Sequence, residues 1–214
     1  ATLDEAVALR ADGDTGPIFA WLAVPGEDYR PALAAEVEVA AYTISQLEEI
    51  AAAGAQVGVQ PRVQLKIDTG LSRGGALLAQ WPQLCAHARA MEVAGRLTIT
   101  GVWSHFAASD EPEHPANDAQ LAVFNQALSD AEAAGLTPQH KHIANSAAAL
   151  LRPDARYTMV RFGLATYGLD PAPGVDAATA DAVIRDLVPA MTVRARLALV
   201  KQVEAGAGVS YGHR

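Results

Sequence analysis

The chain has 214 residues, of which 50% are hydrophobic and 19% are charged, and its formal net charge is −8. This composition predicts a packed core and excludes intrinsic disorder, and the length allows one large domain or two small ones. The negative charge argues against nucleic acid as the main partner, because phosphate binding needs a basic surface. No run of 18 apolar residues occurs, so no membrane span is expected. The single cysteine, Cys85, excludes an internal disulfide and suits the reducing cytoplasm.

Six apolar runs are predicted to be strands. The chain begins with a helix, because Thr2 and Glu5 have the spacing of a capping box. Residues 17–24 follow as an apolar run between Gly16 and Pro25, which is typical of a strand covered on both faces. The other predicted strands are residues 37–43, 62–70, 97–107, 140–147 and 157–168.

Helix signals lie between these runs. Ser45 and Glu48 are predicted to cap a helix that ends at Gly54, and Pro82 suits the first turn of the next helix. A longer helix is predicted from about residue 115 to residue 134, where Gly135 follows as its stop. Alternating strands and helices predict an α/β fold with a parallel sheet, either an open doubly wound sheet or most of a (β/α)8 barrel. No Gly-x-Gly-x-x-Gly turn is present, which weakens the dinucleotide-binding version.

The pattern changes near the end of the chain. A linker rich in Pro, Gly and Ala at 170–180 precedes residues 191–201, where apolar and polar residues alternate as in a half-exposed antiparallel strand. We therefore predict a barrel domain at residues 1–188 and the start of a β-rich C-terminal domain at residues 189–214. The chain starts inside a predicted helix without a methionine, which suggests a fragment.

Chemically active side chains follow several predicted strands. In a parallel barrel these positions share one mouth, where the site of such a fold lies. Cationic, hydroxyl and glycine residues gather there and suit a phosphate together with an anionic oxygen or a ring nitrogen. These residues are Lys66, Asp68, Thr69, Gly70, Arg73, Ser104, His105, Asn145, Ser146, Arg161 and Gly163.

Most of these residues also have a structural interpretation. Taken alone, His105 is more often a hydrogen-bonded structural residue, Lys66 could be solvated or paired with Asp68, and Ser146 could cap the following helix. Arg161 is harder to dismiss, because it interrupts a run that otherwise reads as a fully buried strand. Burying a guanidinium without a partner costs several kcal/mol, so Arg161 needs something to bind.

Five segments, in this order, carry a family resemblance: "KIDTGLSRGG", "GVWSHFA", "HIANSAA", "MVRFGLATYGLDP" and "VSYG". Together they closely resemble bacterial alanine racemases, which are fold-type III enzymes that use pyridoxal 5′-phosphate (PLP). The resemblance implies a partial (β/α)8 TIM barrel with about six of eight strands, a cytoplasmic homodimer and no metal. It also implies interconversion of L-alanine and D-alanine for peptidoglycan precursors, by two bases on opposite faces of Cα.

The resemblance also implies a role for each site residue. Arg161 would donate to the pyridine nitrogen of PLP, and Ser146 would bind its phosphate with the backbone N–H groups of Gly163 and Leu164. His105 would pack near the ring, and Arg73 would reach its phenolic oxygen. The remaining implied roles belong to Lys66, as a carbamate that holds Arg73, to His142 and Asn145, as supports of the ring end, and to Tyr211, as a catalytic base that reaches the partner subunit's barrel.

One catalytic residue of the family has no counterpart in the chain. The lysine that binds PLP covalently precedes a Tyr-Gly-His motif on the first barrel strand, and none of Lys66, Lys141 and Lys201 has this context. The Tyr-Gly-His at 211–213 follows Val-Ser instead. We therefore expect an internal fragment that is inactive by itself. Two alternatives stay open: a racemase for another or a broader set of amino acids, such as serine or lysine, and a PLP- or phosphate-binding module without catalysis.

Overall fold

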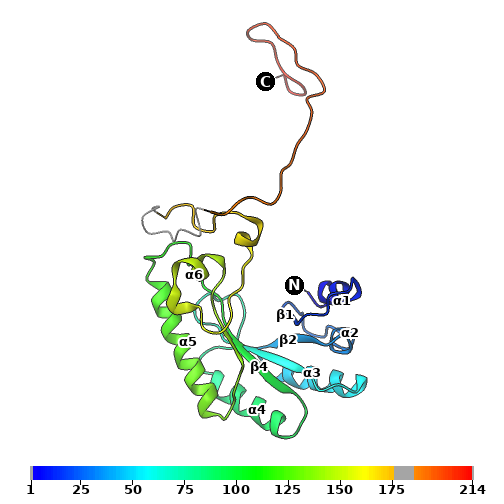
Figure 1. Ribbon diagram of the computed structural model, residues 1–214, viewed down its shortest axis with the longest axis vertical. Helices are drawn as coiled ribbons and strands as arrows, with labels where there is room; N and C mark the ends of the chain where they lie inside the picture. Colours follow the sequence, from blue (N-terminus) through cyan, green and yellow to red (C-terminus); the bar gives the residue numbers. More distant parts are fainter. Residues whose placement is uncertain (1, 176–185, 214) are drawn as a thin grey trace.

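The sheet consists of parallel strands in the order in which they occur along the chain (Figure 1). The computed structural model describes residues 2–175 and 186–213. Within them the strands are β1 (Ile18–Ala20), β2 (Val37–Ala41), β3 (Arg62–Lys66), β4 (Thr98–Trp103) and β5 (His140–His142). Each strand pairs with the next in parallel. A doubly wound sheet would reverse its order at a switch point, so the unbroken order is that of a barrel.

A contact between the two outermost strands shows how strongly the sheet curls. The rings of Phe19 in β1 and His142 in β5 have centroids 5.9 Å apart. In a flat sheet these strands would lie roughly 19 Å apart, since neighbouring strands are spaced by about 4.8 Å. The five strands therefore form part of a barrel wall, and the prediction of a partial α/β barrel is confirmed.

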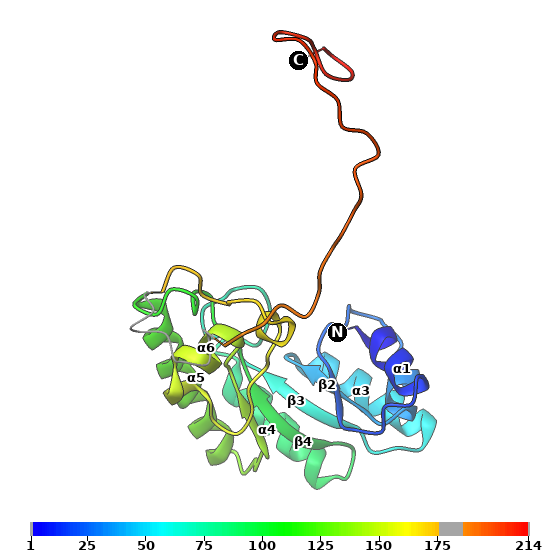
Figure 2. The same cartoon turned by 45° about the horizontal axis from the view of Figure 1, so that its top comes forward.

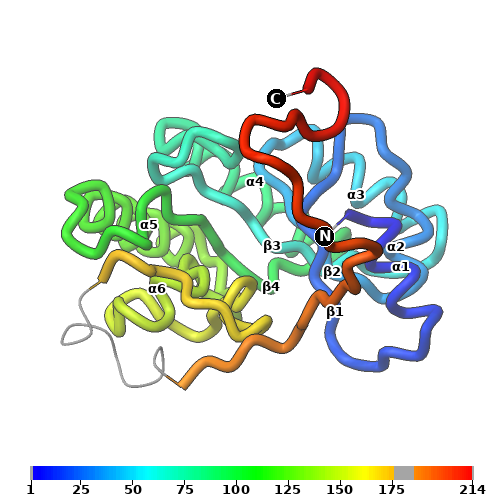
Figure 3. The backbone as a smooth tube through the Cα atoms, turned by 90° about the horizontal axis from the view of Figure 1, so that it is seen from above, coloured from blue at the N-terminus to red at the C-terminus, as the bar shows by residue number. Residues whose placement is uncertain are grey.

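Helices cover the outer side of this wall, as the view along the barrel in Figure 3 shows. They are α1 (Leu3–Ala11), α2 (Arg30–Ala34), α3 (Ile44–Val57), α4 (Trp81–Val93), α5 (Ala116–Ala133) and α6 (Ser146–Leu151). Two short 3₁₀ helices, η1 (Pro153–Ala155) and η2 (Leu164–Tyr167), follow α6. Helices α1 and α5 lie at opposite ends of the curved sheet (Figure 2). Between α4 and α5 the buried Trp81 indole donates to the Ala127 carbonyl at 2.8 Å. None of the helices described is both long and apolar enough to cross a bilayer.

The predicted capping box of α1 is confirmed, whereas the predicted ends of α3 are wrong. Thr43 caps α3, because its hydroxyl accepts the Gln46 amide at 3.1 Å, and the helix ends at Gly58 in the left-handed region at φ 73°. Gly54 lies inside the helix instead, where a Cβ would come within 2.4 Å of the Pro61 ring. Its small size serves close packing rather than termination.

Residues 157–168 do not form the predicted sixth strand. The Thr158 and Arg161 amides donate to the carbonyls of residues 141 and 144, so the segment runs beside β5 without a continuous ladder. It then turns into η2. Phe162 is 49% exposed, so the run is not buried on both sides as its apolar sequence suggested.

Residues 186–213 contain no helix or strand. They lead away from the barrel (Figure 1), and Val193 is 91% exposed. The predicted strand at 191–201 is therefore not formed, since no described segment offers it a backbone to pair with. The boundary between residues 188 and 189 stays a prediction, and part of the predicted linker, residues 176–180, lies outside the described residues.

Candidate active site

A cleft of about 400 Å³ opens at the carboxyl ends of the strands. Its lining includes seven residues that the sequence singled out: Arg73, His105, Asn145, Ser146, Arg161, Gly163 and Leu164. They come from the segments that follow β3, β4 and β5. The structure thus brings most of the sequence-predicted site residues together, whereas their chemical roles stay predictions.

Arg161 is the most thoroughly bonded residue of the cleft. Its Nη2 donates to the Ser104 carbonyl at 2.8 Å and contacts His105 Nδ1 at 3.0 Å, and its Nη1 contacts His142 Nδ1. Nε has no hydrogen-bond partner within the described part of the chain. Burial lowers the pKa of Arg161 to about 10, so the guanidinium stays charged at neutral pH. It is surrounded by neutral acceptors and keeps a donor for a ligand.

The two histidines around Arg161 are held in their neutral forms. Burial lowers the pKa of His105 to about 4, with further lowering by Arg161, Arg73 and Lys66. The pKa of His142 falls to about 2, chiefly through burial and then through Arg161. A neutral imidazole has one donor and one acceptor nitrogen, so each Nδ1 can accept from the guanidinium. The predicted contact of His105 and His142 with the ring end of the site is consistent with this placement.

Ser146 joins the start of α6 to the loop before η2. Its hydroxyl accepts the Gly163 amide at 2.9 Å and the Ala165 amide at 3.4 Å. The helix cap is Asn145 rather than Ser146, because the Asn145 carboxamide accepts the Ala148 amide at 3.1 Å. A Cβ built on Gly163 would meet no atom within 4 Å. Because the Ser146 hydroxyl accepts from these two amides, its own O–H is left to donate toward the open space beside Gly163, which suits a phosphate.

Lys66 and Arg73 are neighbours without a shared carboxylate. The Lys66 ammonium lies 4.7 Å from the centroid of the Trp103 ring, and a Cβ on Gly74 would lie 3.6 Å from it. Burial lowers the pKa of Lys66, and the charges of Arg73 and Arg161 lower it further, whereas Asp68 opposes them. The possible pairing of Lys66 with Asp68 is not formed, since Asp68 instead accepts the Gly70 and Ser72 amides that shape the loop before Arg73.

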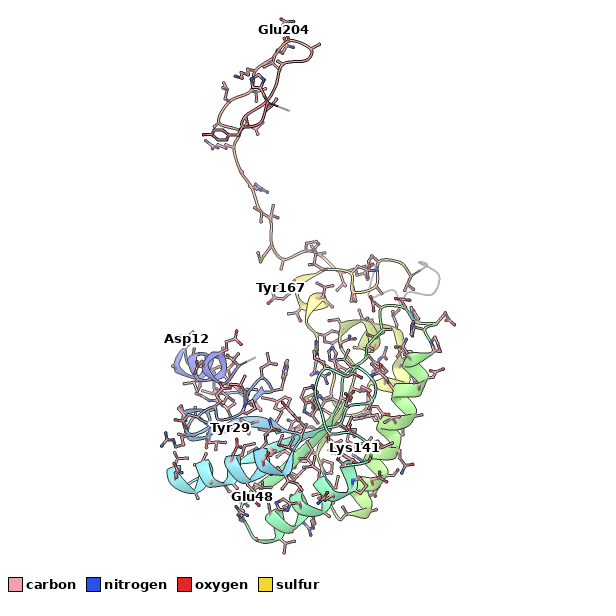
Figure 4. The ribbon with its side chains drawn as sticks, turned by 180° about the vertical axis from the view of Figure 1, so that it is seen from behind. Asp12, Tyr29, Glu48, Lys141, Tyr167 and Glu204 are labelled. Atoms are coloured by element: carbon pink, nitrogen blue, oxygen red, sulfur yellow. The ribbon has the colours of Figure 1, made fainter. Side chains whose placement is uncertain are left out.

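Tyr211 does not join the cleft. Its side chain is fully exposed in the segment that leads away from the barrel, and Figure 4 shows Glu204 of this segment far from Lys141 in the barrel. The proposed second base is therefore absent from the site that this chain forms with its own described residues.

Sequence reasoning missed two tryptophans and a buried acid. Trp21 and Trp103 line the cleft, and the Trp103 ring stacks on His142 with centroids 5.8 Å apart. Arg161 also lies over this ring, at 5.1 Å. Glu38, inside the barrel, is only 5% exposed. Glu38 is a lone charged residue within the apolar run 37–43, as Arg161 is within its own run. By the same argument, its position in the sequence predicted buried hydrogen-bond partners.

Comparison with known proteins identifies the family. The model of the alanine racemase N-terminal domain matches residues 1–171. The alanine racemase of Salinispora arenicola is 50% identical over 212 residues, which cover 99% of this chain and 55% of that protein. The crystal structure of alanine racemase from Streptomyces lavendulae superposes with a TM-score of 0.92 at 46% identity, over 100% of this chain and 55% of that one. The alanine racemase of Bacillus anthracis, solved with bound L-Ala-P, superposes with a TM-score of 0.85 at 31% identity, over 99% of this chain and 53% of that one. The chain spans about half the length of these relatives, and it belongs to the alanine racemase family.

Proposed function

We propose that this chain supplies the PLP-binding half of an alanine racemase, which interconverts L-alanine and D-alanine for peptidoglycan precursors. One observation carries the proposal: a charged Arg161, held by neutral groups and with Nε still available, lies in the same cleft as the hydroxyl and amides at Ser146 and Gly163. A cofactor with a basic ring nitrogen and a phosphate fits this set of donors.

The residues present fit PLP at three points. Arg161 would hold the ring nitrogen, Ser146 and the amides of Gly163 and Leu164 would hold the phosphate, and Arg73 would face the phenolic oxygen. Bound PLP supplies an electron sink that makes the Cα proton of alanine acidic. Because Arg161 stays protonated, it would donate to the ring nitrogen without giving up its proton, which would keep that sink weak. A weak sink favours return of the proton to Cα over transfer of the amino group.

Proton transfer needs one base on each face of Cα. Tyr211 would be one of them and would act in the barrel of a partner subunit, which makes the active protein a homodimer. This assignment rests on the family resemblance, and the full exposure of Tyr211 is compatible with a role outside its own barrel. The second base would be the lysine that binds PLP covalently. The buried free thiol of Cys85 supports a cytoplasmic setting.

The test uses the full-length protein, loaded with PLP and given L-alanine, L-serine or L-lysine in turn. We expect D-alanine to form with the highest kcat/KM. If serine or lysine gave a higher kcat/KM than alanine, that amino acid would be the substrate instead. PLP binding without any racemisation would favour the non-catalytic module. Failure to bind PLP would overturn the proposal. Arg161→Gln is the matched variant, and it should weaken PLP binding without unfolding the barrel.

A further inference from the structure

Buried polar groups form a continuous chain from Glu38 to Arg161. Glu38 Oε2 accepts from Gln64 Nε2 at 2.8 Å, and Gln64 Oε1 lies 2.7 Å from His142 Nε2. His142 Nδ1 then contacts Arg161 Nη1. Gln64 is 1% exposed and His142 is 0% exposed, so these bonds are shielded from bulk solvent. The chain crosses the inside of the barrel from β2 through β3 to β5.

Both ends of this chain fix the direction of its bonds, because the Glu38 carboxylate can only accept and the Arg161 guanidinium can only donate. An ionised carboxylate can only accept, so the Gln64 amide nitrogen must face it and the Gln64 oxygen must face His142. His142 Nε2 must then carry the proton, which leaves a lone pair on Nδ1 for Arg161. Hydrogen bonds from Gln64, Thr100 and Arg62 outweigh burial and hold the pKa of Glu38 below its usual value.

Gly101 gives Gln64 the room to make both bonds. A Cβ at residue 101 would lie 2.6 Å from Gln64 Oε1, which is closer than such atoms approach. Thr100, next to it, donates its hydroxyl to Glu38 Oε2 at 2.8 Å. β4 thus supplies the Thr100 hydroxyl as a donor to the carboxylate, and the missing side chain of Gly101 leaves space for the Gln64 amide. On the other side, Arg62 Nε donates to Glu38 Oε1 at 2.8 Å.

We propose that Glu38 is a positioning residue that sets the tautomer of His142 and, through it, the orientation of Arg161 at the cofactor ring. The inference rests on the proposed function only for the last step, the contact between Arg161 and the ring nitrogen. With Nη1 turned to His142 and Nη2 turned to Ser104 and His105, Arg161 keeps Nε for the ligand.

The first test measures the tautomer in the unaltered full-length protein without PLP. Nitrogen-15 NMR of the histidine side chains distinguishes a protonated ring nitrogen from one with a lone pair. We expect His142 to be protonated on Nε2 alone at neutral pH. A proton on Nδ1, or on both nitrogens, would overturn the proposal without any substitution.

The second test is Glu38→Gln. Arg62 would keep the oxygen of the new amide, so its nitrogen would face Gln64 and force the Gln64 amide to turn over. Gln64 would then donate to His142, and the proton of His142 would move to Nδ1, where it opposes Arg161. We expect this switch in the spectrum. We also expect the Kd for PLP to rise by about tenfold or more, since Arg161 loses an acceptor that orients it.

Arg62→Met is the matched control. It removes the same ion pair but leaves Glu38 Oε2 to accept from Gln64 and Thr100, so the tautomer and PLP affinity should stay unchanged. A His142 tautomer that resists Glu38→Gln, or that switches in Arg62→Met, overturns the proposal. A switch without weaker PLP binding also overturns it, because Arg161 would not have been displaced.

Gly101→Ala serves if Glu38→Gln does not fold. It leaves every charge in place and pushes the Gln64 amide away, so we expect loss of the single Nε2–H tautomer and weaker PLP binding. An unchanged tautomer together with unchanged PLP affinity would contradict the proposal. If the tautomer follows Glu38 but the unaltered protein binds no PLP, the proposed function fails while the link from Glu38 to Arg161 stands.

Discussion

Lys66, Arg73 and Arg161 place three cationic groups at one end of the barrel, and none of them forms an ion pair with a described carboxylate. Lys66 lies over the Trp103 ring, and its pKa is lowered by burial and by the two arginines. A lowered pKa raises the fraction of neutral amine at a given pH. The neutral amine is the form that reacts with carbon dioxide, releasing a proton and leaving a carbamate anion.

We predict that Lys66 is carbamylated in the full-length protein and holds Arg73 through the new anion. Carbon-13 NMR after equilibration with labelled carbon dioxide should give one slowly exchanging carbamate signal, which disappears in Lys66→Arg. Lys141 and Lys201 serve as internal controls for unspecific reaction. A covalent bond between PLP and Lys66 would refute this role, because the residue would then be the cofactor's anchor.

A second residue-scale prediction concerns acid. The unfolded chain protonates its histidines near pH 6.5, whereas folded His105 takes up its proton near pH 4 and folded His142 near pH 2. More protons bind to the unfolded state below pH 6.5, so the free energy of unfolding is greatest above that pH and falls as the pH drops. The slope should approach about 1.4 kcal/mol per pH unit for each of these histidines.

Urea unfolding of the full-length protein between pH 6.5 and pH 5 measures this slope before most carboxylates titrate. His142→Asn should reduce the slope by up to about 1.4 kcal/mol per pH unit, which is the contribution of one histidine. The oxygen of the substituted amide can still accept from Arg161 but does not titrate. Equal slopes in unaltered protein and His142→Asn would show that His142 is not held neutral.

At the scale of elements, a prediction follows from the real start of α3. Thr43→Ala removes the acceptor of the Gln46 amide and should lower the free energy of unfolding by about 1 kcal/mol. Ser45→Ala should cost less, because the Ser45 hydroxyl bonds only to the Thr43 hydroxyl at 3.0 Å. Chemical denaturation of the two variants compares them directly. A larger effect of Ser45→Ala than of Thr43→Ala would show that Ser45 caps the helix, as the sequence predicted.

The same region explains which elements could be predicted from the sequence. The apolar runs located β1 to β5, because strands of a parallel barrel are buried and read as continuous apolar segments. Helix ends were harder, since Thr43 and Ser45 are both good caps and only the geometry selects Thr43. Gly54 resembled a stop, but its contact with Pro61 depends on a loop that the local sequence does not specify.

The prediction of a strand was wrong where backbone pairing is incomplete. Residues 157–168 have the composition of a strand, yet they bond to β5 only at residues 158 and 161 before turning into η2. The cleft around Arg161 could still be predicted, because a charged residue in an apolar run must have partners. Its actual partners, Ser104, His105 and His142, come from β5 and from the loop after β4, and no pattern within one segment reveals them.

At the scale of the whole molecule, the described sheet ends at β1 and β5, and β5 is only partly covered by the segment that follows it. Phe19 and Trp21 extend from β1 toward Trp103, with ring centroids 5.7 Å and 6.0 Å from it. An apolar edge of this kind attracts other strands. We therefore expect the 214-residue chain, expressed alone, to associate or to unfold partly more readily than the full-length protein.

The last prediction is that this chain alone does not racemise alanine. None of its three lysines lines the cleft, and Tyr211 is exposed outside it, so neither face of Cα has its base. Loss of one proton-transfer group costs roughly 10²–10⁴-fold in rate, and the covalent hold on PLP is lost as well. The measurement is D-alanine formation by the purified chain with added PLP and L-alanine, beside free PLP and beside the full-length protein. Turnover by the chain well above that of free PLP would mean that one of its own lysines is the catalytic base. Activity in the full-length protein alone would place that base outside these 214 residues.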